Sequence, residues 1–200
     1  QNNTEAHAIL PALIQYAKYH KCQLAIIPSH YKNLTLFKKN DKKEWCEDVQ
    51  PYLVKGDIQF GNVLIRSDVK INATTLWPLS GKQAHGGPYN WTVFGHPQIQ
   101  SEPVASPGNM MSKRMYTTAS CTEPNYSISD LVEKARFHHC HGALIIENAG
   151  QHCFVRRLNS NADGSFYDLD KYVTADGVTT GHSIAALIPG DEHVKFNACK

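Results

Sequence analysis

The chain has 200 residues, of which 42% are hydrophobic and 19% are charged. This length and composition are typical of a globular protein with a sizeable core and exclude a disordered or low-complexity chain. The 20 basic and 18 acidic side chains give a formal charge of +2. That charge is too small to indicate nucleic-acid binding by itself, and no apolar run approaches the ~20 residues that cross a bilayer.

The cysteines and the start of the chain indicate the cellular compartment of the protein. Six cysteines are present, and none has the short spacing of a zinc knuckle or a redox pair. We therefore expect reduced thiols and a cytoplasmic protein. The polar start, residues 1–5, lacks the pattern of a secretory signal, and the absence of Met leads us to expect that the natural chain begins earlier. Five Asn-x-Ser/Thr sequons point the other way and leave a secreted, glycosylated domain as a weaker alternative.

Hydrophobic spacing predicts helices and strands in alternation. Apolar residues recur at helical intervals over residues 5–20, although Pro11 falls within that helix. Short bounded apolar runs predict buried strands. The expected helices cover 5–20, part of 44–54 and 129–137, and the expected strands cover 24–28, 62–66, 91–95, 114–118, 143–147, 153–158, 166–172 and 184–188. Residues 77–90, 101–109 and 174–181 are expected to be loops.

This pattern predicts an α/β protein: a mixed sheet with flanking helices and long Pro/Gly-rich loops. The strand at 153–158 is expected to form a hairpin with the strand at 143–147, because a short turn separates them.

The end of the chain carries the most specific chemical pattern. The apolar run 184–188 is followed by Pro189-Gly190 and then by Asp191 and His193. Residues two positions apart in an extended segment project to the same side, so a carboxylate and an imidazole can converge on one ion. Ligands of open α/β sheets bind outside the carboxyl ends of the strands. Asp191 and His193 are therefore a candidate pair of metal ligands.

Histidines in other loops provide further candidates. His30 and Lys32 follow an expected strand, His96 follows another, and His138 and His139 belong to a His-His-Cys-His sequence. We predict that these loops face a ligand, since loops at strand ends carry function. Ordinary polar turns and hydrogen-bonded core histidines remain open as alternatives. Adjacent residues point apart in extended structure, so zinc binding by the His-rich sequence alone is weakly indicated.

Several segments in order resemble one protein family. They include Ile26-Ile27-Pro28, Phe94-Gly95-His96-Pro97, Tyr116-Thr117-Thr118, Val155-Arg156-Arg157-Leu158-Asn159 and Gly190-Asp191-Glu192-His193. The chain resembles the N-terminal region of a phage family whose C-terminal half is a calcineurin-like, Mre11-like metallophosphoesterase, with the pre-early DNases of T5-like phages among its relatives. The resemblance implies an accessory α/β domain over 1–182 and the truncated start of a metallophosphoesterase domain over 183–200.

The same resemblance implies a function. Asp191 and His193 would hold the first ion of a two-metal site, which residues outside this chain would complete. The expected cofactor is a divalent metal ion, with Mn²⁺ as the preferred choice for this donor pair. The expected function is that of one part of a metal-dependent phosphodiesterase or DNA nuclease of phage type, inactive as this segment alone. The expected partner is DNA in the host cytoplasm, with no membrane and with a possible homo-oligomer. A non-catalytic DNA-binding or oligomerisation module is the alternative.

Overall fold

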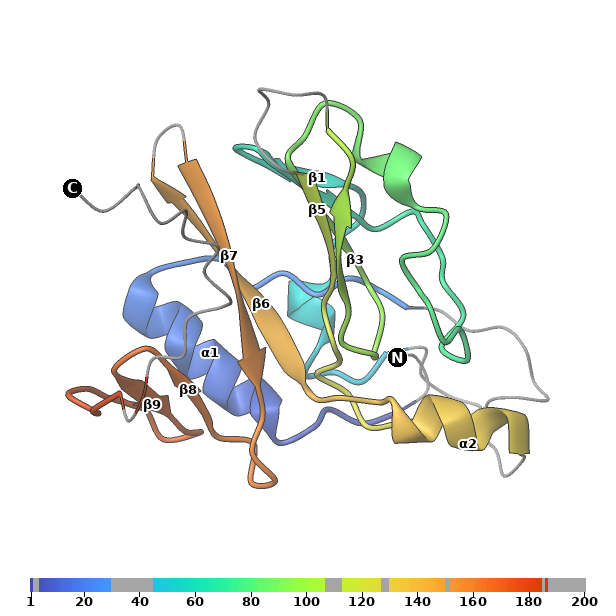
Figure 1. The fold of residues 1–200 in the computed structure, drawn as a ribbon. Helices are drawn as coiled ribbons and strands as arrows, with labels where there is room; N and C mark the ends of the chain where they lie inside the picture. Colours follow the sequence, from blue (N-terminus) through green and yellow to red (C-terminus); the bar gives the residue numbers. More distant parts are fainter. Residues whose placement is uncertain are drawn as a thin grey trace, which may run out of the picture.

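The computed structural model describes residues 1, 4–29, 45–106, 113–126, 130–149, 152–184 and 186. Two α-helices and ten strands lie in these ranges (Figure 1). In chain order the elements are α1 (Ile9–His20), η1 (Gln50–Tyr52), β1 (Ile58–Phe60), β2 (Val63–Arg66), η2 (Gln83–Gly86), β3 (Trp91–Phe94), β4 (Ser101–Val104), β5 (Lys113–Thr117), α2 (Asp130–Phe137), β6 (Gly142–Ala149), β7 (His152–Asn159), β8 (Phe166–Asp168), β9 (Lys171–Val173) and β10 (Val178–Thr179).

The largest sheet is mixed, as predicted. Its strand order is β1-β2-β3-β5-β4, with β2, β3 and β5 parallel and the edge strands β1 and β4 antiparallel to their neighbours. The connection from β2 to β3 carries only the short 3₁₀ helix η2. No α-helix connects these two parallel strands. The helix α1 packs instead on β7, β8 and β9.

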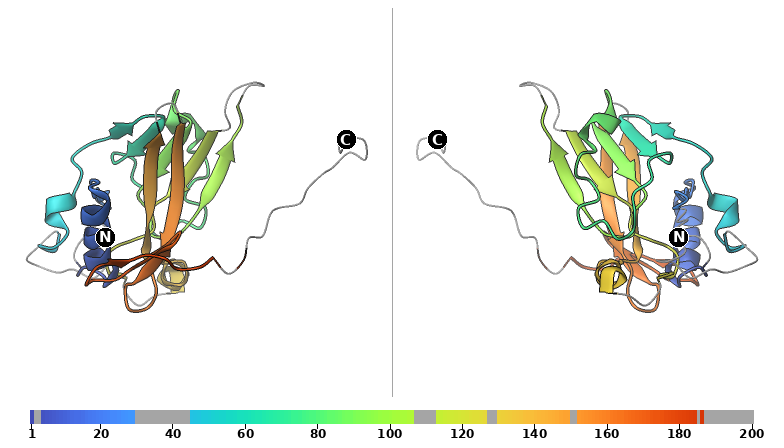
Figure 2. Two further views of the ribbon diagram at one scale, coloured as in Figure 1. Left: turned by 90° about the vertical axis from the view of Figure 1, so that its left-hand side faces the viewer. Right: turned by 90° about the vertical axis from the view of Figure 1, so that its right-hand side faces the viewer.

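The β6–β7 hairpin lies between α1 and the large sheet (Figures 1 and 2). Its pairing is the predicted one, with Ala143 opposite Leu158 and Ile146 opposite Val155. Ala143 and Ile145 pack into the core around α1, whereas Leu144 and Ile146 pack with β2 and β3. Because successive side chains of a strand point to opposite faces, an uninterrupted apolar run is what a strand packed on both faces requires.

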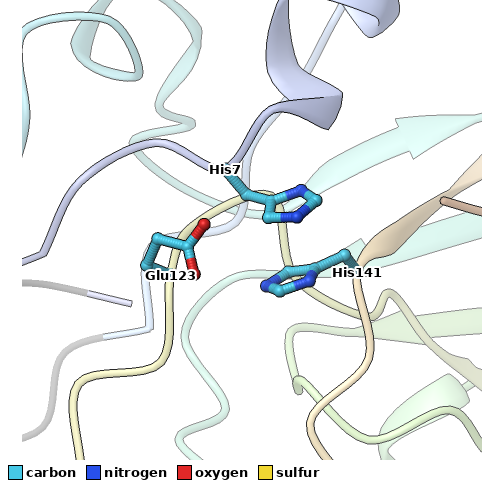
Figure 3. Close-up of side chains that lie close together, drawn as sticks. All are labelled: His7, Glu123 and His141. Atoms are coloured by element: carbon cyan, nitrogen blue, oxygen red, sulfur yellow. The ribbon is translucent and has the colours of Figure 1, made fainter. Parts of the chain in front are cut away.

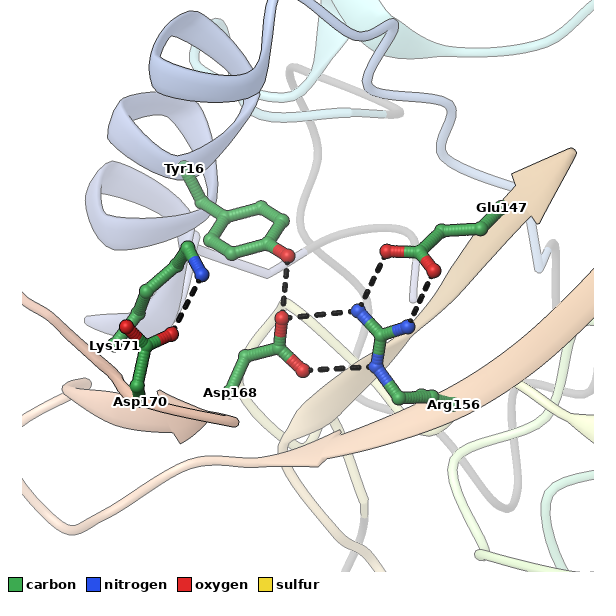
Figure 4. Close-up of polar contacts among 6 residues, drawn as sticks. All are labelled: Tyr16, Glu147, Arg156, Asp168, Asp170 and Lys171. Carbon is green, nitrogen blue, oxygen red and sulfur yellow. Dashed lines mark hydrogen bonds and ion pairs between the residues drawn. The ribbon is translucent and has the colours of Figure 1, made fainter. Parts of the chain in front are cut away.

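A core forms where α1 meets β7 and the β8–β9–β10 meander. The α1 residues Ile9, Leu13 and Tyr16 are buried there with Phe166 and Val173. Figure 4 shows the polar contacts beside this core, in which Tyr16 of α1 reaches the carboxylate of Asp168 on β8. These contacts link the helix to the strands after it.

The proline of α1 lies near its start, and hydrogen bonds are made at both ends of the helix. The helix begins at Ile9, so Pro11 falls in the first turn, where a missing N–H costs no intrahelical bond. His7 accepts a hydrogen bond from the Ile9 backbone N–H through Nδ1 at 3.1 Å, which satisfies one orphan donor. At the other end Lys21 has a φ of 52° and its N–H caps the last turn.

Several predicted elements differ from the structure. Residues 24–28 form no strand, and only Ile26 bridges Leu53, through two backbone hydrogen bonds. The expected loop at 101–109 contains β4, which tolerates Pro103 because it is the sheet edge. The expected loop at 174–181 contains β10. Within 44–54 the helix is limited to the 3₁₀ turn η1.

The run 184–188 falls mostly outside the described residues. Ile184 is 72% exposed and belongs to no strand, so the predicted burial is wrong at that residue.

Neither of the described α-helices has the length and hydrophobicity of a membrane span. The cysteines at 22, 46, 121, 140 and 153 are free thiols.

Candidate functional site

Three distant segments of the chain meet beside the N-terminus of α1. Ala6 pairs with Thr122 in an antiparallel bridge, and Ser120 pairs with His141 in a parallel one. The His7 N–H donates to the Cys121 carbonyl at 3.0 Å, and the Glu123 N–H donates to the Glu5 carbonyl at 2.9 Å. His7 and Glu123 are thus diagonal neighbours on one face of the pair, at a spacing that long side chains can bridge.

The side chains of His7, Glu123 and His141 converge at this junction (Figure 3). One ligand atom from each residue lies within 4.8 Å of the others, and all three side chains are half-buried. The two imidazole rings are stacked, with centroids 3.5 Å apart and planes inclined by 10°. The carboxylate of Glu123 lies beside the stack.

His139 extends the cluster toward the interior. Its ring is 4.9 Å from that of His141, measured between centroids. Its Nδ1 lies 2.9 Å from the hydroxyl of Tyr126, which also accepts a hydrogen bond from the side-chain amide of Gln1. In the described part of the chain, the buried Nε2 atoms of His139 and His141 have no hydrogen-bond partner. Buried polar atoms are rarely left unpaired, so each such atom calls for an explanation.

Burial controls the charge of His139 and His141. Burial, together with the neighbouring His141, lowers the pKa of His139 to about 3. Burial and the neighbouring His7 also lower the pKa of His141. Burial raises the pKa of Tyr126 to about 12. At neutral pH His139 and His141 are therefore neutral imidazoles, the form in which histidine binds metals or accepts protons.

The observed conformation limits what the cluster can do as it stands. A ring nitrogen binds an ion through a lone pair in the plane of its ring. The lone pairs of stacked rings lie in two nearly parallel planes, so His7 and His141 do not both point at one ion. The arrangement is a stacked imidazole pair beside a carboxylate, and a coordination site would require one ring to turn.

The structure places three of the predicted ligand-facing residues. His96 is 1% exposed; its Nδ1 accepts a hydrogen bond from the Gln98 N–H at 3.1 Å, and its Nε2 lies 3.0 Å from the Asn72 carbonyl. Both nitrogens are used within the fold, so the prediction that His96 faces a ligand is wrong. His138 is half-exposed and contacts the ring of Phe137. Only His139 lies beside the cluster.

The other predicted site residues lie outside the described residues. These are His30, Lys32, Asp191 and His193. The sequence did not single out His7 or Glu123, because residues more than one hundred positions apart give no local motif. The His-rich sequence was the one available signal, and it led to His139 and His141 without their partners.

An apolar cavity of about 530 Å³ reaches the same junction, where Cys121, Thr122 and Gly142 line it. Its wall includes Leu13, Ile27, Val93 and Leu144, and Lys21 is its one charged side chain among the described residues. A wall that is mostly apolar favours an apolar occupant. The histidine cluster, where three possible metal ligands converge, is the more specific candidate site.

Comparison with known proteins gives one relative. No family model matches the chain, and no solved structure matches it. Protein A1 of Escherichia phage T5 is 29% identical to the chain over 207 residues. The chain is similar to a phage protein. The match covers 98% of the chain and 37% of Protein A1, so the chain spans little more than a third of that relative's length.

Proposed function

We propose that this chain is the accessory N-terminal part of a metal-dependent phosphodiesterase of phage type that cleaves DNA. The similarity to Protein A1, which extends over nearly the whole chain and covers 37% of that longer protein, supports the phage assignment. The nuclease chemistry is proposed from the donor pair Asp191 and His193. The mixed α/β sheet of the described ranges is compatible with an accessory domain.

The chemistry assigned to the end of the chain follows from its donors. Asp191 would supply a carboxylate oxygen and His193 an imidazole nitrogen to the first of two divalent ions, with Mn²⁺ as the proposed ion. Bound divalent ions activate a water and stabilise the leaving oxygen. Two ligands hold an ion weakly, so the remaining ligands belong to the longer polypeptide, and this chain alone is proposed to be inactive.

The experiment compares the complete gene product with the 200-residue chain, each assayed for cleavage of linear DNA with added Mn²⁺. We expect cleavage by the complete protein only, and loss of cleavage after Asp191→Ala. His182→Ala is the matched control, because His182 lies shortly before the motif in the sequence and its side chain contacts Thr179, Tyr167 and Tyr172. That variant should retain the activity.

Two results would count against the proposal. Cleavage by the 200-residue chain would assign the catalytic residues to the chain itself. Full activity of the complete Asp191→Ala protein would show that Asp191 is not a ligand of a catalytic metal ion. DNA binding by the 200-residue chain, with no cleavage by either protein, would support the non-catalytic DNA-binding module instead.

A further inference from the structure

We propose that His7, Glu123 and His141 bind a Zn²⁺ ion at the junction of their three segments, at a site separate from Asp191 and His193. The site does not depend on the proposed nuclease function. It would join the segment before α1, the segment after β5 and the start of β6. Only the side chains of the cluster have to adjust, because the backbone is already held by the two bridges.

The donors match zinc chemistry. Two imidazoles and one carboxylate are a known ligand set for Zn²⁺, with a fourth position left for water. Their ligand atoms already lie within 4.8 Å of one another. All three side chains are half-buried, so the cluster lies between the interior and the surface of the fold. The unpartnered Nε2 of His141 supplies an independent observation, since a bound cation would satisfy that buried atom.

The hydrogen bond of His7 determines what must change when the ion binds. His7 accepts the Ile9 N–H through Nδ1, so its proton is on Nε2 in the neutral ring. A histidine that binds a metal through Nε2 carries its proton on Nδ1 and donates it. Binding through Nε2 requires that proton to move to Nδ1, and binding through either nitrogen requires His7 to release the Ile9 N–H. Zinc binding and release of the first-turn amide of α1 are thus coupled.

The direct test is calorimetric titration of Zn²⁺ into the chain in which Asp191 and His193 are both replaced by Ala. That parent removes the other predicted metal pair. We expect binding of one ion, and a loss of at least tenfold in affinity after Glu123→Gln. His7→Asn should lose affinity to a similar degree while keeping the bond to the Ile9 N–H, because an Asn side chain readily accepts from the backbone two residues further on. His182→Ala removes an imidazole outside the cluster and should bind as the parent does.

A second readout follows the Ile9 amide. Its backbone NMR signal should shift, and its hydrogen exchange should accelerate, when Zn²⁺ binds the parent but not when Zn²⁺ is added to His7→Asn. Equal Zn²⁺ affinity in the parent, Glu123→Gln and His7→Asn would overturn the proposal, as would the absence of any binding. Both substitutions are conservative, and a thermal melt of each identifies any variant that loses affinity by unfolding.

Discussion

The hydroxyl of Tyr16 donates a 2.6 Å hydrogen bond to the Asp168 carboxylate in the core (Figure 4). Asp168 is 6% exposed and also receives Nε and Nη2 of Arg156, each at 3.0 Å. Arg156 in turn pairs with Glu147 at 2.7 Å. The contacts connect α1, β8, β7 and β6, so this network holds the helix on the side of the hairpin that faces away from the large sheet.

Removal of the Tyr16 hydroxyl tests this network. Tyr16→Phe keeps the ring contact with Phe166 and leaves Asp168 with Arg156 alone. A hydrogen bond to a charged group contributes about 1.5–3 kcal/mol, so we expect the free energy of unfolding to fall by about that amount. Urea denaturation measures it. The matched control is Tyr19→Phe, because Tyr19 is 50% exposed and its loss should fall within about 0.5 kcal/mol. Equal losses in the two variants would contradict a structural role for the Tyr16 hydroxyl.

The same network makes stability depend on acid pH. Burial alone would raise the pKa of Asp168, but hydrogen bonds from Arg156 and Tyr16 outweigh it and leave the pKa below the ordinary 3.8. The hydrogen bond from Arg156 also holds the pKa of Glu147 below the ordinary 4.5. Both carboxylates therefore take up protons more readily in the unfolded chain. Their contribution is complete above the unfolded values and is lost as the pH falls through the folded ones.

The pH prediction is a difference between two proteins. Between pH 5 and pH 3 the unfolding free energy of the wild type should fall more steeply than that of Asp168→Asn, which cannot titrate at that position. The buried histidines affect both proteins alike, so the difference isolates the carboxylate. Urea midpoints measured across this pH range supply the comparison. Parallel curves would show that Asp168 has the same pKa in both states.

The hairpin could be predicted from sequence because its chemistry is local. The apolar run that begins at Ala143 gains its signal from burial on both faces, and a short turn leads to its partner strand. The sequence does not predict β4 because Pro103 argues against a strand unless that strand lies at a sheet edge. Edge position depends on the tertiary arrangement, which local patterns do not contain.

The candidate site depends even more on tertiary structure. His7 and Glu123 meet only because the segment around Ala6 pairs with the segment around Thr122. His96 shows the opposite error, since a histidine at a strand end has a ligand-binding pattern and yet serves the core here. The sequence shows which side chains could do chemistry, but long-range pairing decides which of them meet.

Thiol exposure gives a prediction about the hairpin's packing. Cys153 is 3% exposed and packs between β7 and the large sheet, whereas Cys22 is exposed after α1. We expect Cys22 to be alkylated by N-ethylmaleimide before Cys153, although partial burial raises the pKa of Cys22 and slows its reaction. Peptide mass spectrometry of timed samples gives the order. Early labelling of Cys153 would mean that the hairpin separates from the sheet in the folded protein.

Gly142 tests the junction between the histidine cluster and the hairpin. A Cβ at this position would lie 2.3 Å from the backbone carbonyl oxygen of Leu158, on the paired strand, so the strands would have to separate. Gly142→Ala should lower the free energy of unfolding by about 1–3 kcal/mol, the usual cost of overpacking. Gly56→Ala is the control, because no atom of the described residues, apart from its own chain neighbours, lies within 4 Å of its Cβ position. Urea denaturation of both variants decides the matter: equal stability would mean that β6 and β7 are farther apart at this end than the structure shows, and the position of His141 would change with them.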